Sequence, residues 1–294
     1  MAYRTVILLA DGVPATIPDI KPALSDINCD TLGASDATFV QTLAVRHRPA
    51  AIVLGERLPA GGPLVALRRL RGSVHTAAIP VVAIVAPGPP KQALLTAGAD
   101  ECLEPPISVD EMMRAIQARL GVVRDVATAP SEVLADTARI VAVDRSGLAN
   151  NEPDESLDLI TRLATRILEA PVTLVSIVGA DRQVFKSQIG VEAPYDKGTD
   201  LSHSFCQWVV SSHEELVIDD ARTHAVLRRN LAVRAMGVVA YAGVPIAAVT
   251  GDGAAMPGRG ARVVCMYSTV ERIEPATRVQ RLRIEAFSVR GTRE

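Results

Sequence analysis

Cys206 and His203 come nearest, in this 294-residue chain, to a nucleophile with an activating base. Cysteine reacts as the thiolate, which a neighbouring base or cation favours. The same two residues offer sulfur and nitrogen ligands to a haem or a metal ion, but no second spaced Cys or His cluster completes a ligand set. The other cysteines, Cys29, Cys102 and Cys265, form no CxxC pair, which favours reduced thiols. We therefore predict no catalytic residue, no metal ion and no cofactor.

Two carboxylates each follow an apolar run in the first half of the chain. Asp11 follows Thr5–Ala10, and Glu56 is separated from Ala51–Leu54 by a glycine, Gly55. Short runs rich in Val and Ile suit strands that are covered on both faces of a parallel sheet. The carboxyl ends of such strands line the crevice in which open α/β sheets bind ligands. We expect Asp11 to cap the helix that follows it, and a metal site is the alternative.

Helix-like stretches alternate with these runs and with a third run, Pro80–Val85. Apolar residues recur at helical spacing in three of these stretches: Asp36–Arg48, Pro63–Arg71 and Ser108–Leu120. Ser108 stands at an N-cap position in front of two acids. This alternation predicts right-handed crossovers and a doubly wound parallel α/β sheet.

Residues 1–122 resemble the receiver domains of two-component response regulators. The resemblance rests on the strand that leads into Gly55-Glu56-Arg57-Leu58-Pro59, on Leu9-Ala10-Asp11-Gly12 and on the stretch from Gly98 to Pro106. It implies a five-stranded sheet and a phosphoacceptor pocket that needs acids for Mg²⁺, an acceptor aspartate, a hydroxyl and a lysine. It also implies a docking face made of residues 92–97, 101–103 and 108–120.

The positions that correspond to this pocket hold Asp11, Gly55, Val85 and Pro105. One acid of the usual pair is present, whereas the acceptor, the hydroxyl and the lysine are replaced. Glycine has no carboxylate and cannot form an acyl phosphate. The resemblance therefore implies a degenerate pseudo-receiver that is not phosphorylated. It also implies a cis bond between Pro105 and Pro106.

Residues 123–152 are predicted to form a helical linker. Ser131–Ala149 reads as a helix, and Asn150-Asn151-Glu152-Pro153 reads as a turn. Apolar residues recur at every seventh position: Leu120, Ala127, Leu134, Val141 and Leu148. This spacing is typical of a coiled-coil seam, although polar residues interrupt it. A helical dimer contact and a helix packed on its own domain are both open.

The second half carries the signals of an α+β domain. Ser156–Ala170 is an amphipathic helix, and a hairpin joins the strands Val172–Val178 and Val184–Ile189. Further strands are expected at Leu216–Ile218, Tyr241–Ile246 and Arg262–Tyr267, with a glycine-rich loop over Val249–Gly260 and a last helix over Thr277–Phe287. The pattern predicts a central antiparallel sheet flanked by helices.

Roughly residues 137–288 resemble the GAF family, which gives a GAF-like domain at 153–290. The ordered matches are Ala170-Pro171-Val172, Gln183-Val184-Phe185, Ser204-Phe205-Cys206 on a presumed helix, Asp219-Asp220-Ala221, Asn230 and the run from Tyr241 to Ile246. One departure is Val226-Leu227, where related domains tend to have Arg-Phe. The resemblance implies a ligand pocket lined by Phe205, Cys206, Trp208, Tyr241 and Tyr267. The alternative is that these side chains fill the core.

The composition narrows the class of protein. A net charge of −2 and a pI of about 6.2 argue against a nucleic-acid-binding surface. No run of eighteen apolar residues or signal peptide occurs, so we expect a cytoplasmic protein without membrane contact. The hypothesis is a non-catalytic, two-component-type regulator that contacts a kinase, a phosphatase, another regulator or a second copy as a homodimer, independently of phosphorylation. The alternative is a sensor whose GAF pocket binds a small molecule or cofactor and thereby controls partner docking.

Overall fold

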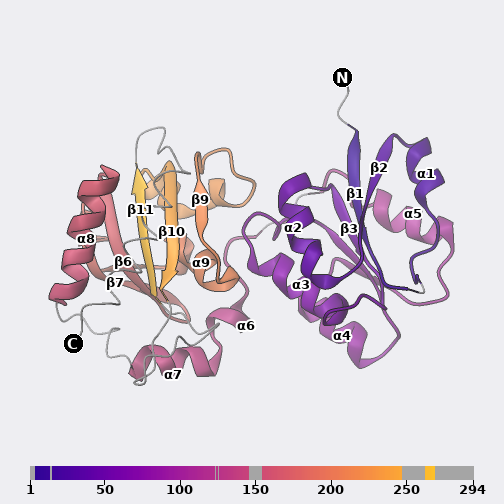
Figure 1. Cartoon of the computed structure of the whole chain (residues 1–294), viewed down its shortest axis with the longest axis horizontal. Coiled ribbons are helices and arrows are strands. Elements are labelled where there is room, and N and C mark those ends of the chain that lie inside the picture. The colour runs from indigo at the N-terminus through magenta and orange to yellow at the C-terminus, as the bar shows by residue number, and fades with distance from the viewer. Residues whose placement is uncertain are drawn as a thin grey trace. The chain divides into compact units, whose positions relative to one another are not determined.

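The computed structural model describes residues 4–13, 15–122, 124, 126–145, 154–246 and 262–268. Of Arg145, Ile167, Ile246 and residues 262–268 only the backbone is described. The chain divides into two compact units, residues 1–126 and 127–294 (Figure 1). Four predicted features lie outside the described residues: the turn over 150–153, Leu148, the glycine-rich loop over 249–260 and the last helix over 277–287.

The first unit contains a parallel sheet of five strands in the order β2-β1-β3-β4-β5. The strands are β1 (Thr5–Ala10), β2 (Cys29–Ala34), β3 (Ala51–Leu54), β4 (Val81–Ile84) and β5 (Glu101–Leu103). Every residue of β3 and β4 is buried, which explains why both strands are continuously apolar. The order is that of a doubly wound sheet whose topology reverses beside β1, and it confirms the predicted fold class.

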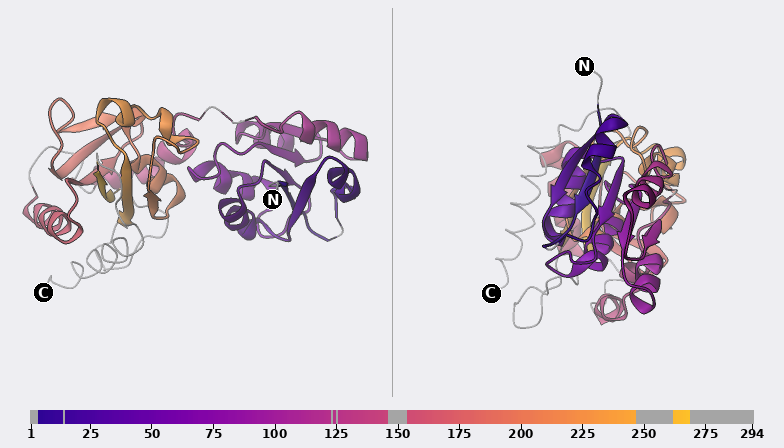
Figure 2. Two further views of the ribbon diagram at one scale, coloured as in Figure 1. Left: turned by 90° about the horizontal axis from the view of Figure 1, so that it is seen from above. Right: turned by 90° about the vertical axis from the view of Figure 1, so that its right-hand side faces the viewer.

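Helices cover both faces of this sheet (Figures 1 and 2). They are α1 (Lys21–Asp26), α2 (Ala37–His47), α3 (Gly62–Gly72), α4 (Pro89–Thr96) and α5 (Val109–Gln117). Residues of α2, α3 and α4 share one apolar cluster with the sheet, and residues of α1 and α5 share the other. The short helix α1 and the edge strand β2 were not predicted as elements.

Local hydrogen bonds explain where these helices begin. The carboxylate of Asp36 accepts the Thr38 amide at 2.7 Å at the start of α2. The hydroxyl of Ser108 accepts the Glu111 amide at 3.1 Å, which confirms the predicted N-cap of α5. The peptide bond between Pro105 and Pro106 is cis, as expected.

The second unit contains an antiparallel sheet of six strands in the order β8-β7-β6-β11-β10-β9. The strands are β6 (Val172–Val178), β7 (Arg182–Ile189), β8 (Gly198–Asp200), β9 (Leu216–Ile218), β10 (Ala240–Ile246) and β11 (Arg262–Ser268). The helices are α6 (Ser131–Leu134), α7 (Thr137–Arg145), α8 (Glu155–Leu168), α9 (Cys206–Ser212) and α10 (Leu231–Ala235). Residues of α8 form an apolar cluster with β6 and β10, and α9 also contacts these strands. The antiparallel sheet was predicted; β8 and α10 were not.

The described part of the linker is not the single helix that was predicted. The helix is interrupted between α6 and α7, at Ala135 and Asp136. Here the Asp136 carboxylate accepts a hydrogen bond from the Arg139 amide at 2.8 Å. Leu134 is almost fully buried, whereas Val141 is 39% exposed, so these two members of the heptad pattern do not share one buried seam. Both helices belong to the second unit, which favours a linker packed on its own domain.

Arg139 fixes α7 to this unit. Arg139 is 2% exposed, and its guanidinium donates to the carbonyl oxygens of Val178 at 2.6 Å, of Gly179 at 3.0 Å and of Leu134. Burial lowers the pKa of Arg139, and the charge of Asp136 opposes that shift. Within the described ranges, no helix is both long enough and apolar enough to cross a membrane.

Candidate functional site

Two places in the structure correspond to predicted sites. The first is the carboxyl edge of the parallel sheet, where Asp11 follows β1 and Gly55 follows β3. The Gly55 amide donates to the Ala10 carbonyl at 2.7 Å, so the loops after β1 and β3 lie together. This edge is where a doubly wound sheet binds its ligands.

The carboxylate of Asp11 is occupied by donors from its own loop. Oδ1 accepts from the Gly12 amide and from the Thr16 hydroxyl, both at 2.9 Å. Oδ2 accepts from the amides of Thr16 and of Ile17, the latter at 2.6 Å. The expectation that Asp11 caps the next helix is wrong, because these donors precede α1. A metal ion at Asp11 would have to displace them, and the described residues contain no group of three His, Cys, Asp or Glu arranged for a metal.

The side chain of Asp11 fills the space beside Gly55. A Cβ atom on residue 55 would lie 2.1 Å from Asp11 Oδ1 and 2.8 Å from Thr16 Oγ1, far inside van der Waals contact. An acceptor aspartate therefore does not fit this backbone while Asp11 and Thr16 keep their hydrogen bonds. Thr16 was not predicted, because it lies in a loop without a motif and is brought here by the path of the chain.

Glu56 joins two loops at the same edge. Its Oε1 accepts from the Ala86 amide at 3.1 Å, and its own amide donates to the Thr16 hydroxyl at 3.0 Å. Ala86 follows β4, so a carboxylate side chain connects the loop after β3 with the loop after β4.

The remaining pocket positions carry no phosphate-sensing side chain. Val85 is buried and its amide donates to the Leu103 carbonyl at 3.0 Å, so it contributes only an apolar side chain. Pro105 is exposed and follows β5. Near it, Lys91 forms an ion pair with Glu104 at 2.7 Å. Asp11 and Gly55 are thus in contact, while Val85 and Pro105 follow β4 and β5 along the same edge.

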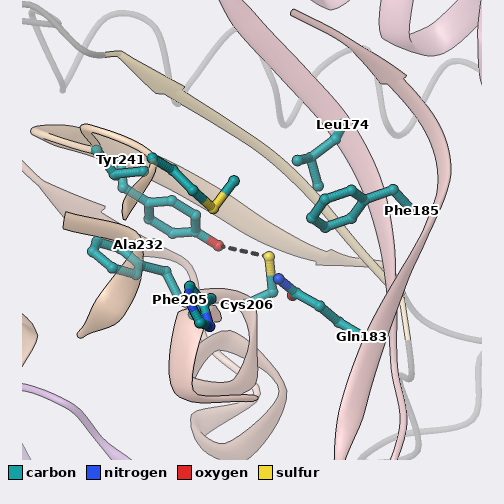
Figure 3. Close-up of a pocket in the computed structure, with 10 residues that line it drawn as sticks. Leu174, Gln183, Phe185, Phe205, Cys206, Ala232 and Tyr241 are labelled. Carbon is teal, nitrogen blue, oxygen red and sulfur yellow. Dashed lines mark hydrogen bonds between the residues drawn. The ribbon is translucent and has the colours of Figure 1, made fainter. Parts of the chain in front are cut away.

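The second place is a small pocket between the antiparallel sheet and helices α9 and α10. In Figure 3, Tyr241 from β10 and Cys206 from α9 point toward each other, with Leu174 and Phe185 across from them. Its lining consists of Leu174, Gln183, Phe185, His203, Phe205, Cys206, Ala232, Met236, Val238 and Tyr241. The cavity volume is about 20 Å³, which is room for about one water molecule.

The polar groups of this pocket already have partners in the protein. Gln183 Oε1 accepts from the hydroxyls of Ser176 at 3.1 Å and Ser204 at 2.6 Å, and Nε2 donates to Thr199 Oγ1 at 2.8 Å. The Tyr241 hydroxyl donates to Cys206 Sγ at 3.5 Å. The pocket in this form therefore offers an apolar, nearly filled space.

Three of the five predicted pocket residues line it: Phe205, Cys206 and Tyr241. The rings of Phe205 and Tyr241 lie 5.2 Å apart, centroid to centroid. Trp208 is buried on α9 and is not among the lining residues. Tyr267 pairs with Tyr241 across β10 and β11, but its side chain lies outside the described residues.

Sequence reasoning also misplaced or missed parts of the pocket. The helix begins at Cys206, so Ser204 and Phe205 precede it instead of lying on it. Ala232 lies on α10, which has too few residues for a helical pattern to be visible, and Met236 lies in the turn after it. Leu174 could have been found, because in β6 it alternates with Val175, which packs against α8.

His203 and Cys206 both line the pocket, but their described contacts lead to different partners. His203 Nδ1 lies 3.1 Å from the Ser202 hydroxyl, and its ring contacts Tyr195 at a centroid distance of 5.5 Å. Cys206 is hydrogen-bonded to Tyr241. The geometry therefore gives no direct support to a thiol activated by His203.

A third feature is an open groove beside β5. It has a volume of about 370 Å³ and is lined by Glu101, Leu103, Glu111, Arg114, Ala115, Ala118 and Arg119. Arg119 pairs with Glu101 at 3.0 Å across it. The groove lies on the β5 and α5 part of the docking face that the receiver resemblance implies.

Comparisons with known proteins agree with this division into two units. A family model described as "GAF domain" matches residues 152–255. The chain is 30% identical over 115 residues to the cyclic di-GMP phosphodiesterase PA2567 of Pseudomonas aeruginosa, covering 39% of this chain and 19% of that protein. It is 33% identical over 116 residues to the DNA-binding dual master transcriptional regulator RpaA of Synechocystis, covering 39% of this chain and 48% of that protein. The matched part of the chain thus spans about a fifth of the length of the phosphodiesterase and about half of the length of RpaA.

Solved structures similar to the chain include receiver domains. The receiver domain of the sensor histidine kinase PA1611 from Pseudomonas aeruginosa PAO1 is 25% identical, with 40% of this chain and 99% of that chain covered and a TM-score of 0.37. The Francisella response regulator 1452 receiver domain is 24% identical, with 39% and 94% covered and a TM-score of 0.35. The strand order of the first unit carries the fold assignment independently of these scores.

Proposed function

We propose that this chain, a receiver-type unit followed by a GAF domain, is a non-catalytic regulator of two-component signalling that works through phosphorylation-independent protein–protein contacts. One observation carries the proposal: the space that an acceptor side chain would need at Gly55 is filled by the hydrogen-bonded carboxylate of Asp11. With Val85 and Pro105 at the hydroxyl and lysine positions, the pseudo-receiver has neither an acceptor nor a sensor for a phosphoryl group.

A fixed conformation suits a constant docking module. Glu56 holds the loops after β3 and β4 together through the Ala86 amide. We assign docking to the surface of α4, β5 and α5, where the groove beside Glu101 and Arg119 lies. A kinase, a phosphatase, another regulator or a second copy in a homodimer is the proposed partner. The proposal includes a cytoplasmic location and no contact with nucleic acid or membrane.

Treatment of the purified chain with acetyl phosphate and Mg²⁺ tests the central claim. We expect intact-protein mass spectrometry to find no phosphoryl adduct, while a receiver with an intact acceptor, treated in parallel, becomes modified. A stable adduct that maps to Asp11 or Glu56 by peptide mass spectrometry would overturn the proposal, because these carboxylates lie at the edge where a receiver accepts its phosphoryl group.

The second candidate function is a ligand sensor, and the pocket at Cys206 and Tyr241 favours it. No Lys, Arg, Asp or Glu is among the side chains described as lining this pocket, so it suits an uncharged, mostly apolar molecule better than a nucleotide. A ligand of ordinary size would have to move the aromatic side chains, since the cavity volume is about 20 Å³.

Native mass spectrometry and absorbance spectra of protein purified from its own cells separate the two candidates. Colourless protein at the mass of the bare chain supports a structural GAF domain. A stoichiometric mass surplus that disappears in a Phe205→Trp variant, designed to fill the pocket, supports the sensor.

A further inference from the structure

The two sides of the first unit carry opposite charge. Residues 37–99, which contain α2, α3 and α4, include seven Lys or Arg residues and one acid, Glu56. The remaining residues of the unit, 1–36 and 100–126, include five Lys or Arg residues and eleven acids. The helices show the same difference: α2, α3 and α4 on one face of the sheet hold five Lys or Arg residues and no acid, whereas α1 and α5 on the other face hold three acids and two basic residues.

Four exposed arginines stand on two neighbouring helices of the basic side. Arg46 lies in the last turn of α2 and Arg48 at its C-cap, while Arg68 and Arg69 lie on α3. The two helices pack side by side (Figure 1). None of the four takes part in an ion pair between described residues, although five other basic residues of this unit do. We call these four arginines together with Phe39 the basic face.

Two titratable groups near the helix pair, Asp36 and His75, are affected by the charges of these arginines. The Thr38 hydroxyl, then the amides of Thr38 and Phe39 and the charge of Arg69, lower the pKa of Asp36, so Arg69 lies near the start of α2. Burial and then the charge of Arg48 lower the pKa of His75, so the end of α2 lies near the segment after α3. The arginines therefore spread along both ends of one helix pair.

An exposed aromatic ring lies on the same surface. Phe39 is 56% exposed, and it is seven residues before Arg46, which places both on one side of α2. Val45 on this helix is 38% exposed. Arginine and aromatic residues are the types enriched in protein–protein interfaces, whereas a surface that binds only phosphates gains nothing from an exposed apolar ring.

We propose that the basic face docks an acidic protein surface whose carboxylates pair with the arginines and whose apolar side chains cover Phe39. The proposal rests on the proposed function as an interaction protein, but it concerns a different face from the one formed by α4, β5 and α5. Arginine suits this role because its planar guanidinium binds a carboxylate through two parallel hydrogen bonds. The acidic opposite side of the unit would repel the same partner and so orient it.

The test uses the full chain and a fluorescein-labelled helical peptide that is rich in Glu and carries a stripe of Leu. Fluorescence anisotropy is measured at low and at physiological ionic strength. We expect the wild-type chain to bind the peptide, and an Arg46→Glu/Arg68→Glu variant to bind it at least about tenfold more weakly, which corresponds to about 1.4 kcal/mol. Arg69 is left unchanged because its charge lies near Asp36 at the N-cap of α2.

Two further variants and a second probe make the outcome decisive. Phe39→Ala is expected to weaken binding of the peptide, and Arg228→Glu/Arg229→Glu, two exposed arginines of the second unit, is expected to leave it unchanged. Equal binding by the wild-type and the Arg46→Glu/Arg68→Glu chains overturns the proposal, and so does an absence of binding. A short DNA duplex that binds more tightly than the peptide through the same arginines overturns the choice of a protein partner. None of these results depends on whether acetyl phosphate modifies the chain.

Discussion

At the scale of single residues, the position that defines the first unit is Gly55, and its environment predicts a stability effect. In a Gly55→Ala chain the new Cβ would press against Asp11 Oδ1, so Asp11 must give up hydrogen bonds to its loop. We expect this variant to lose about 1–3 kcal/mol of unfolding free energy, as for overpacking at other buried sites. Urea unfolding followed by far-ultraviolet circular dichroism measures the loss.

Gly33→Ala is the matched control for this experiment. Gly33 lies on β2, and a Cβ there meets no heavy atom within 4 Å. We expect its unfolding midpoint to stay at or slightly above that of the wild type, because replacing glycine restricts the unfolded chain. Equal midpoints for the two variants would mean that Asp11 relaxes without cost, and the filled acceptor position would then be no barrier to an aspartate.

His75 predicts how the first unit responds to acid. Burial, and then the charge of Arg48, lowers the pKa of His75 from its ordinary value of 6.5. The folded state therefore favours the neutral imidazole, and the unfolded state binds more protons as the pH falls below 6.5. We expect the unfolding free energy to decrease from pH 7 toward pH 5, and a His75→Gln variant to lose part of this decrease. An identical pH profile for both chains would contradict the assignment.

At the scale of elements, the sequence was sufficient wherever burial left a continuous signal. β1, β3, β6 and β9 begin and end at the predicted residues, because each is short and mostly apolar. β2 was missed because it is an edge strand in which Asp30, Thr31 and Gly33 interrupt the apolar residues. Helices of five or six residues, such as α10 and α1, are too short for a periodic pattern.

The candidate sites could likewise be predicted only in part. Gly55 and Asp11 could be identified because each follows a strand at a recognisable position. The fact that Asp11 fills the space beside Gly55 could not be read from the sequence, since it depends on the path of the loop that brings Thr16 to both residues. In the GAF pocket, Met236 was missed for the same physical reason: it arrives from a turn that is remote in sequence from Cys206.

Arg139 predicts how the linker is held. Its guanidinium reaches the carbonyl oxygens at the turn between β6 and β7, and a Met in its place would leave these groups buried without their donor. We expect Arg139→Met to increase amide hydrogen exchange across α6 and α7, measured by mass spectrometry of peptides from 131–145. Arg162→Met, at an exposed position on α8, is the control and should leave these peptides protected. Unchanged exchange in Arg139→Met would show that apolar contacts such as Leu134 suffice.

At the scale of the whole molecule, each unit has an apolar core of its own. The clusters formed by the first unit contain no residue of the second, and the reverse also holds among the described residues. The chain has one tryptophan, Trp208, which is buried in the second unit. Its fluorescence therefore reports the unfolding of that unit alone, while circular dichroism reports both.

Arg71 allows this independence to be tested. Its buried guanidinium donates to the carbonyls of Gly98, Ala77 and Ile79 at 2.9–3.2 Å and to the Asp100 carboxylate at 3.0 Å, which ties α3 to the strands beyond it. Burial, and then the charge of Arg124, lowers the pKa of Arg71 to about 9, so the side chain is still charged at neutral pH.

An Arg71→Met chain should lose about 3 kcal/mol of unfolding free energy in the first unit, because Asp100 and the three carbonyls lose a buried, charged partner. Because the two cores are separate, we expect the circular dichroism transition of the first unit to move to lower urea while the midpoint of Trp208 fluorescence stays constant. Arg68→Met, at an exposed position on the same helix, serves as the control and should change either midpoint little. A parallel shift of the fluorescence midpoint in Arg71→Met would instead mean that the receiver-type unit and the GAF domain unfold as one cooperative block, which is the physical coupling that a signal passing between them would need.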